Sequence, residues 1–197
     1  MPKWYQNGYY LEKPHLNKVK MLEQIILVDK DDNAIGVEEK LNAHRLGLLH
    51  RAFSIFVLRK NPDLELLMQK RALGKYHSGG LWTNSCCGHP RPSESLMEAA
   101  NRRLNEEIGL TLPLKEIGIF TYKADVGENL REHELDHVLI GYWENQSIIV
   151  NPEEVEILKW RKIDEVLSAI NNTPTVFTAW FKETLKIVIN FTKKNRG

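Results

Sequence analysis

The sequence predicts an α+β protein in which mixed β-sheets are flanked by helices. Apolar runs of strand type and segments with helical spacing follow one another irregularly, without the regular β-α-β repetition typical of a parallel sheet. The chain has 197 residues, a length for which one domain with a well-developed core is the default. We therefore expect a single domain over residues 22–197, preceded by an N-terminal extension of residues 1–21.

Composition argues against several classes of partner. The 27 Lys and Arg residues against 26 Asp and Glu residues leave a formal net charge of +1, so no overall field favours nucleic acid or an anionic membrane. The start, "MPKWYQNGYYLEK", has no apolar core of signal-peptide length, and no later run approaches a membrane span. Two cysteines in the whole chain do not indicate an oxidising compartment. We expect a cytoplasmic protein without nucleic-acid or membrane partners, and protein partners are not predicted.

The first predicted strands follow the extension. Residues 1–20 are rich in Tyr, Trp, Asn and Lys without helical or strand period, and their aromatic side chains suggest docking on the domain. From Glu23, "EQIILVDKDDNAIG" is an apolar run with an Asp-Asp-Asn turn, which predicts a strand and a reversal. Residues 52–58 ("AFSIFVL") and 64–69 ("LELLMQ") predict a β-hairpin with "NPD" at its turn.

The second half of the chain adds further strands and helices. Its apolar runs predict strands at residues 117–124, 133–143 and 155–160. Helical spacing predicts helices at residues 164–170 and 177–191. The mixture of both types in one chain is the reason for the α+β expectation.

The segment "SESLMEAANRRLNEEIGL" predicts the most informative helix. Ser93 or Ser95 can cap its start, and Gly109 can end it in a left-handed conformation. On the helical wheel, Arg103 and Glu107 fall inside the apolar arc. Burying a charge is costly unless the charge is paired or coordinated. The two residues therefore face something that needs them, or they pair with each other across one helical turn.

The only two cysteines stand side by side in "WTNSCCGHP". Adjacent residues hold their Cα atoms about 3.8 Å apart, whereas a relaxed disulfide wants roughly 4.4 to 6.8 Å. Two cysteines are also too few for a closed four-cysteine or three-cysteine zinc site. At least one of them is a candidate for chemistry, and the alternative is that both are small buried apolar residues.

A motif that begins at Gly88 resembles the Nudix box, G-x5-E-x7-R-E-U-x-E-E-x-G-U with U aliphatic. Here it reads Gly88, five residues, Glu94, seven residues, Arg102, and then "RLNEEIGL". In Nudix hydrolases the box carboxylates hold the divalent cations that activate diphosphate hydrolysis. Arg103 stands where those enzymes have a Glu, so the resemblance implies a Nudix-like fold retuned from hydrolysis to holding a diphosphate.

Four further motifs are similar to those of type I isopentenyl-diphosphate delta-isomerase, across residues 22–182. They are Glu39-Lys40 with two histidines before "AFS", then "RALGK", "WTNSCCGHP" and "EHELD", in the order that the family has them. The resemblance implies an enzyme of isoprenoid biosynthesis that interconverts isopentenyl diphosphate and dimethylallyl diphosphate. Protonation of the alkene would give a tertiary carbocation, and loss of another proton would complete the reaction.

This reaction needs two proton-transfer groups on either side of the substrate. The resemblance implies that Cys87 is one and Glu134 the other, with Tyr122 hydrogen-bonding near the carboxylate. Cys86 occupies a position that the family leaves variable, and we interpret it as a small buried residue.

Carboxylates and histidines predict a metal site. Strand alternation places Glu132 and Glu134 of "EHELDH" on one face, where they repel each other unless a proton or cation intervenes. The resemblance implies a five-ligand site of these two residues with His44, His50 and His89. Such mixed ligation suits Mn²⁺ or Zn²⁺ better than Mg²⁺. The remaining histidines are interpreted as structural: His15, His77, His133 and His137.

The diphosphate needs local cations, and the resemblance assigns that role to Lys40, Arg71, Lys75 and Arg103. It also implies a Mg²⁺ at Glu107 that bridges to phosphate oxygens, with the main-chain carbonyl of Cys87 as a further ligand. Trp180 matches an active-site tryptophan that could stabilise the carbocation with its π face. At helical spacing, Trp180 could equally belong to a core stripe.

Two other functions remain open at this stage. A Nudix diphosphohydrolase would release phosphate or pyrophosphate and would not depend on Cys87. A catalytically silent diphosphate sensor would need only the cations and Glu107. Neither needs an acid and a base that face each other, so the isomerase is the preferred hypothesis.

Overall fold

The structure, a computed structural model, describes residues 5–6, 9–10 and 23–194. Within the first part, β1 (Tyr5–Gln6) and β2 (Tyr9–Tyr10) form a two-stranded antiparallel pair, where the sequence predicted no strand. The expected docking of residues 1–20 and the predicted role of His15 lie outside the described residues.

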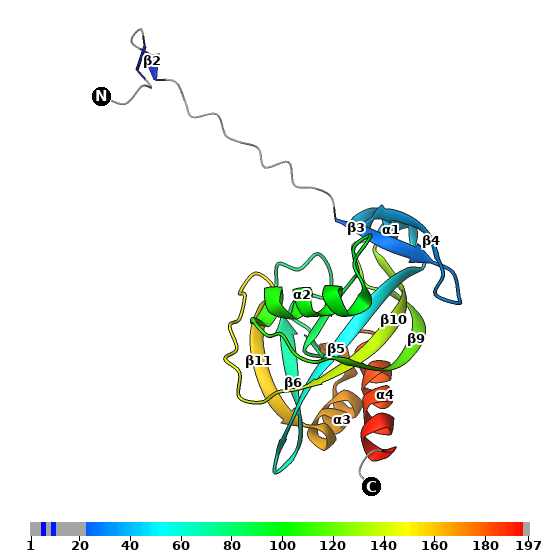
Figure 1. Cartoon of the computed structure of the whole chain (residues 1–197), viewed down its shortest axis with the longest axis vertical. Helices are drawn as coiled ribbons and strands as arrows, with labels where there is room; N and C mark the ends of the chain where they lie inside the picture. The colour runs from blue at the N-terminus through cyan, green and yellow to red at the C-terminus, as the bar shows by residue number, and fades with distance from the viewer. Residues whose placement is uncertain (1–4, 7–8, 11–22, 195–197) are drawn as a thin grey trace.

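A nine-stranded sheet forms the centre of the domain (Figure 1). Its backbone path is β11-β6-β5-β10-β9, in which β5 and β10 run parallel and the other neighbours antiparallel. β3 pairs with β4 and β5, β7 with β6, and β8 with β5. The strands are β3 Gln24–Val28, β4 Ala34–Glu39, β5 His50–Asn61, β6 Asp63–Arg71, β7 Trp82–Thr83, β8 Cys86–Gly88, β9 Lys115–Asp125, β10 Arg131–Tyr142 and β11 Val155–Lys162.

Four α-helices accompany the sheet in the described part of the chain: α1 Lys40–Leu46, α2 Leu96–Ile108, α3 Ile163–Asn172 and α4 Phe181–Lys194. Ser95, one of the two caps that the sequence offered, caps α2 and forms a capping box with Glu98. Gly109 ends the helix at φ 69°, as the sequence predicted. None of these helices combines the length and the apolar character that crossing a bilayer requires.

The two larger parts of the core lie on opposite faces of the sheet because side chains alternate along the strands, and a smaller third cluster contains Ile26, Val28 and Leu135. On β5, Ile55 and Val57 pack with α2, whereas Phe56 and Leu58 pack with α3 and α4. Figure 1 shows α2 on one side of the sheet and α3 with α4 on the other. At about 25 cal/mol per Å² of buried apolar surface, these two clusters are the main stabilising contribution to the fold.

The α+β prediction is confirmed, with differences in detail. The short α1, β7 and β8 were not predicted, because each has fewer residues than a periodicity window needs. The helix predicted for residues 177–191 begins only at Phe181. Before it, Pro174–Val176 form a 3-10 turn and Phe177 makes a β-bridge with Trp82, so tertiary pairing overrides helical spacing there.

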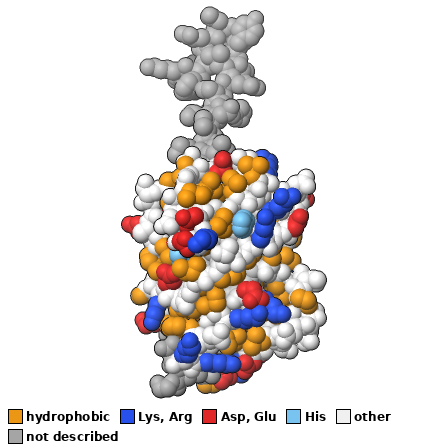
Figure 2. Space-filling view, turned by 90° about the vertical axis from the view of Figure 1, so that its right-hand side faces the viewer, with side chains coloured by type: hydrophobic (Ala, Val, Ile, Leu, Met, Phe, Trp, Pro, Cys, Tyr) orange, Lys and Arg blue, Asp and Glu red, His pale blue; other side chains and the backbone are white. Residues whose placement is uncertain are grey.

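Charged side chains of both signs are interspersed with apolar ones on the face shown in Figure 2. This distribution agrees with the formal charge of +1. Recognition of an anion therefore depends on a local group of cations.

Candidate active site

Strand β10 places carboxylates on one face of the sheet. Glu132, Glu134 and Asp136 are all buried, in the alternation that the sequence predicted. On one side, parallel β5 sets His50 opposite Glu134, and on the other, antiparallel β9 sets Tyr122 opposite Glu134. The register of three strands thus assembles this part of the site.

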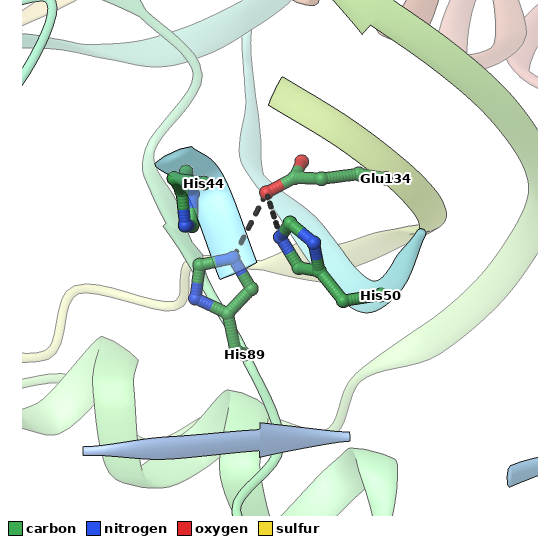
Figure 3. A group of neighbouring side chains, drawn as sticks. All are labelled: His44, His50, His89 and Glu134. Atoms are coloured by element: carbon green, nitrogen blue, oxygen red, sulfur yellow. Dashed lines mark hydrogen bonds and ion pairs between the residues drawn. The ribbon is translucent and has the colours of Figure 1, made fainter. Parts of the chain in front are cut away.

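Three histidines lie around Glu134 (Figure 3), and one of them also contacts Glu132. His44 lies in α1, His50 begins β5 and His89 follows β8. His89 Nε2 is 2.9 Å and His50 Nε2 is 3.5 Å from the same oxygen, Glu134 Oε1. His44 Nε2 is 3.3 Å from Glu132 Oε2. The structure therefore brings together four of the five side chains that the resemblance assigned to one metal site, His44, His50, His89 and Glu134. The fifth, Glu132, lies in an adjoining group with His44 and His77.

The ring nitrogens fit a bound cation. Nδ1 of His44 donates to the carbonyl of Lys40 at 2.7 Å, and Nδ1 of His50 donates to the carbonyl of Leu48 at 2.8 Å. A neutral ring with its proton on Nδ1 turns the Nε2 lone pair toward the carboxylates, a contact that repels unless a proton or metal intervenes. Among the described residues, His50 Nε2 and Glu132 Oε2 are buried without a hydrogen-bond partner. This group of side chains is compatible with a divalent metal.

The protonation states of His89 and Glu134 favour metal binding as well. Burial lowers the pKa of His89 to about 4, so its ring is neutral near pH 7. Burial by itself would raise the pKa of Glu134, but its contacts with His50 and His89 outweigh burial and hold that pKa well below its usual range. Neutral imidazole and ionised carboxylate are the forms that ligate metals.

Cys87 lies in β8 beside β5. Its thiol donates to Asn84 Oδ1 at 3.2 Å, and Ser54 Oγ is 3.7 Å from the sulfur. The same Asn84 oxygen accepts from Trp180 Nε1 at 3.2 Å. Burial, followed by the charge of Asp136, raises the pKa of Cys87 to about 12. The thiol therefore keeps its proton near pH 7 and has a fixed orientation.

A hydrogen bond to the second carboxylate oxygen, Oε2, orients the side chain of Glu134. The Tyr122 hydroxyl donates to Glu134 Oε2 at 2.7 Å, while Oε1 faces the histidines. Burial, followed by the charges of Glu132 and Glu134, raises the pKa of Tyr122 well above its ordinary value, so the phenol remains a donor. Cys87, Glu134 and Trp180 line one pocket, so the thiol and the carboxylate open into the same cavity.

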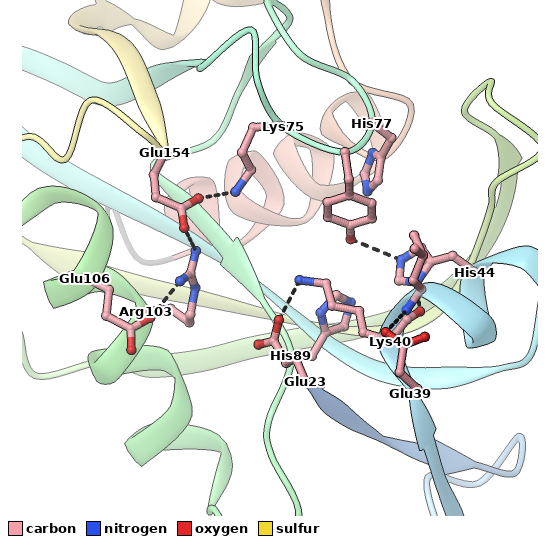
Figure 4. Close-up of polar contacts among 12 residues, drawn as sticks. Glu23, Glu39, Lys40, His44, Lys75, His77, His89, Arg103, Glu106 and Glu154 are labelled. Atoms are coloured by element: carbon pink, nitrogen blue, oxygen red, sulfur yellow. Dashed lines mark hydrogen bonds and ion pairs between the residues drawn. The ribbon is translucent and has the colours of Figure 1, made fainter. Parts of the chain in front are cut away.

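The predicted diphosphate-binding cations line that pocket as well: Lys40, Arg71, Lys75 and Arg103. Carboxylates of the protein contact three of them (Figure 4). Lys40 Nζ is 3.0 Å from Glu23 Oε2, and Glu154 pairs with both Lys75 and Arg103. A diphosphate offers the same kind of acceptor oxygens and would compete for these cations.

Arg103 and Glu107 pair with each other across one turn of α2, which was the alternative left open by the sequence. Arg103 nevertheless reaches the pocket. Glu107 is buried, and its second oxygen accepts from Gln69 Nε2 at 2.8 Å. A Mg²⁺ at Glu107 would have to take over the oxygen that Arg103 contacts here.

Several pocket residues were missed or misread by sequence reasoning. Tyr76 OH is 3.3 Å from His44 Nε2, and His77 Nε2 is 2.9 Å from Glu132 Oε1. His77 was interpreted as structural, but it faces the carboxylate cluster. Spacing gave no signal for it, because the loop between β6 and β7 has no period. Asn84 could have been found, since it lies within the "WTNSCCGHP" motif.

Two of the other histidines interpreted as structural lie away from the cluster. His133 donates from Nδ1 to the carbonyl of Gly47 at 2.9 Å. His137 contacts Glu116 and Asp32. Strand alternation puts both rings on the face of β10 opposite to Glu132 and Glu134, as the sequence interpretation required.

Comparison with known proteins defines the class. Residues 48–181 match the NUDIX domain. The fold is similar to a crystal structure of a Deinococcus radiodurans protein, with a TM-score of 0.69 and 18% identity, covering 83% of this chain and 98% of that one. A MutT protein from Methanosarcina mazei gives a TM-score of 0.59 at 18% identity, covering 76% of this chain and 96% of that one. The Nudix-like fold predicted from the box is thus confirmed.

Sequence relatives narrow the class. An isopentenyl-diphosphate delta-isomerase of Photobacterium profundum is 48% identical over 171 residues, covering 85% of this chain and 95% of the relative. An isopentenyl-diphosphate delta-isomerase 2 of Photorhabdus laumondii is 52% identical over 165 residues, covering 84% and 92%. The chain belongs to the isopentenyl-diphosphate delta-isomerase family within the Nudix superfamily.

Proposed function

We propose that this enzyme interconverts isopentenyl diphosphate and dimethylallyl diphosphate with Cys87 and Glu134 as its proton-transfer groups. The observation that carries the proposal is that a protonated thiol and an ionised carboxylate line one pocket, which four cations also line. A hydrolase needs no such pair of proton donor and acceptor. Arg103, which stands where the Nudix box of hydrolases has a glutamate, also favours an isomerase over a hydrolase.

The two proton-transfer groups have different roles, because Cys87 is protonated and Glu134 is ionised near pH 7. Cys87 delivers a proton to the terminal alkene carbon, and Glu134 removes a proton from the carbon on the other side of the cation. Tyr122 donates to Glu134 at 2.7 Å and orients it. Trp180, buried and held by Asn84, presents a π face that favours positive charge and leaves less room for water.

The remaining charged groups hold the substrate. Lys40, Arg71, Lys75 and Arg103 bind the diphosphate, and Glu107 with the Cys87 carbonyl would hold a Mg²⁺ that neutralises phosphate charge when bound. Mn²⁺ or Zn²⁺, and less favourably Mg²⁺, fits the site of His44, His50, His89, Glu132 and Glu134. Two further features remain predictions from the sequence. One is the boundary between an N-terminal extension of residues 1–21 and a domain of residues 22–197, and the other is a cytoplasmic location.

The test is to incubate the purified protein with isopentenyl diphosphate and Mg²⁺ and to follow the alkene protons by NMR. We expect conversion to dimethylallyl diphosphate without phosphate release. Unchanged alkene signals together with released phosphate would instead establish a diphosphohydrolase. Ligand binding with neither product would establish a diphosphate sensor.

Metal removal is expected to abolish isomerisation reversibly. Without a cation, the lone pairs of His50 Nε2 and Glu134 Oε1 face each other at 3.5 Å, and the base loses its fixed position. Activity should fall to background after chelation and return when Mn²⁺ or Zn²⁺ is added with Mg²⁺. At a free concentration about 100 times Kd, the metal should also raise Tm by roughly 5–10 °C. Full activity in protein shown by elemental analysis to be metal-free would contradict this prediction.

Replacement of Arg103 by glutamine is expected to weaken substrate binding. Hydrogen bonds to a charged partner contribute about 1.5–3 kcal/mol, which corresponds to an increase in KM of roughly 10–150-fold. Steady-state kinetics with isopentenyl diphosphate measures this change. Arg161→Gln is the control, because Arg161 lies in β11, contacts Glu165 and does not line the pocket that Arg103 lines. Equal increases in KM for the two variants would show that Arg103 has no specific role in binding the substrate.

A further inference from the structure

His77 contacts the carboxylate cluster although no motif assigns it a role. It is buried in the loop between β6 and β7, and its Nε2 lies 2.9 Å from Glu132 Oε1. The other oxygen of the same carboxylate, Oε2, lies 3.3 Å from His44 Nε2 and has no hydrogen-bond partner among the described residues. The two oxygens of Glu132 therefore have different surroundings, one facing His77 and the other facing the predicted metal ligands.

We propose that His77 is a positioning residue, which donates from Nε2 to Glu132 Oε1 and so keeps Oε2 directed at the cation. The proposal rests on the metal site of the proposed function. A carboxylate side chain rotates freely unless its outer oxygen is held, and hydrogen-bond partners behind the ligands of a metal orient those ligands. Holding Oε1 reduces the conformational freedom that Glu132 must lose when the metal binds.

The tautomer of His77 distinguishes it from the ligands. His44 and His50 donate from Nδ1 to backbone carbonyls and leave Nε2 with a lone pair. In His77, Nδ1 lies 3.1 Å from the hydroxyl of Ser78, which can donate to it and place the ring proton on Nε2. The opposite tautomer would set a lone pair against a carboxylate oxygen at 2.9 Å. A ring that carries its proton on Nε2 donates to Glu132 and has no lone pair left there for a metal.

The loop that carries His77 is fixed by residues of the substrate pocket. Arg71 Nη2 donates to the carbonyl of His77 at 3.2 Å. The ring meets Trp180 nearly edge to face, with centroids 6.1 Å apart and planes at 82°, and it meets Tyr76 at 4.3 Å and 85°. These contacts limit the rotation of the imidazole, so its donor direction is defined before any metal arrives.

The experiment is a titration of the purified, metal-stripped full chain with Zn²⁺ or Mn²⁺ against a chromophoric chelator. We expect His77→Ala to bind the metal about 10–100-fold more weakly. His77→Gln, whose amide can place an N–H near the position of Nε2, should restore most of that affinity. His133→Ala is the matched control, because its ring hydrogen-bonds Gly47 on the other face of β10, and it should bind as the wild type does.

Three outcomes would overturn the proposal. The first is unchanged metal affinity in His77→Ala, and the second is equal weakening in His77→Ala and His77→Gln. The third is a wild-type metal with four imidazole ligands in X-ray absorption spectra instead of three, which would make His77 a direct ligand. Melting of the metal-stripped variants separates a loss of fold from a loss of affinity. The titration does not depend on turnover, so its failure is distinguishable from failure of the isomerase assay.

Discussion

Replacement of Cys87 by alanine is expected to lower kcat by about 10²–10⁴-fold, the range that a positioned proton donor contributes. An unactivated alkene is a very weak base, so its protonation depends on an acid held in contact with the terminal carbon. The thiol is held by Asn84 at 3.2 Å, and its pKa of about 12 keeps it protonated at neutral pH. Alanine removes the proton and leaves the neighbouring groups in place.

The adjacent cysteine provides the control for this prediction. Cys86 is fully buried among the apolar residues that pack against α2, so Cys86→Ala should cost some stability and little activity. Conversion of isopentenyl diphosphate is followed by NMR for both variants, and Tm is recorded for each. A kcat in Cys87→Ala within tenfold of the wild type would exclude the thiol as the proton donor.

The surroundings of Cys87 show which features of the site could be predicted from residues that are close together in the chain. The motif "WTNSCCGHP" separated Cys87 from Cys86, and strand alternation in "EHELDH" placed the two glutamates on one face. Both are properties of neighbours in the chain. Asn84, which accepts the hydrogen bond of the Cys87 thiol, stands in the same motif. Tyr122 and Trp180 are distant in the chain, and only the family resemblance indicated them, because their approach depends on strand register and packing.

Loops account for most of what the sequence did not predict. Glu154, which pairs with Lys75 and Arg103, lies in the connection before β11. His77 lies in the connection between β6 and β7. Such segments have no hydrophobic period, so their side chains are placed by tertiary contacts alone. The short α1 escaped prediction because its 7 residues are too few to show a helical period, and because the buried His44 takes a position where an apolar residue would have marked the helix.

Replacement of Glu134 by glutamine is expected to reduce kcat by at least 10²-fold, through loss of the carboxylate that removes the second proton. Glutamine keeps the shape of the side chain, but an amide oxygen cannot accept a proton at neutral pH. The same change weakens the metal site, since Oε1 faces His89 at 2.9 Å and His50 at 3.5 Å. The loss of the proton acceptor and the weakening of the metal site must therefore be distinguished.

Assays at saturating metal, with Tyr122→Phe as a control, distinguish loss of the proton acceptor from loss of a metal ligand. If Glu134 acts only as a ligand, excess Mn²⁺ or Zn²⁺ will restore activity to Glu134→Gln, whereas loss of the base persists with the site filled. Tyr122→Phe removes one hydrogen bond to Glu134 Oε2 and leaves the charge, so a decrease of about tenfold is expected from a hydrogen bond of about 1.5 kcal/mol. Metal content is measured alongside kcat in each variant. Recovery of wild-type kcat in metal-saturated Glu134→Gln would move the proton acceptor to another carboxylate. Glu132 is the first candidate, because it is buried on the same face of β10 and lines the same pocket.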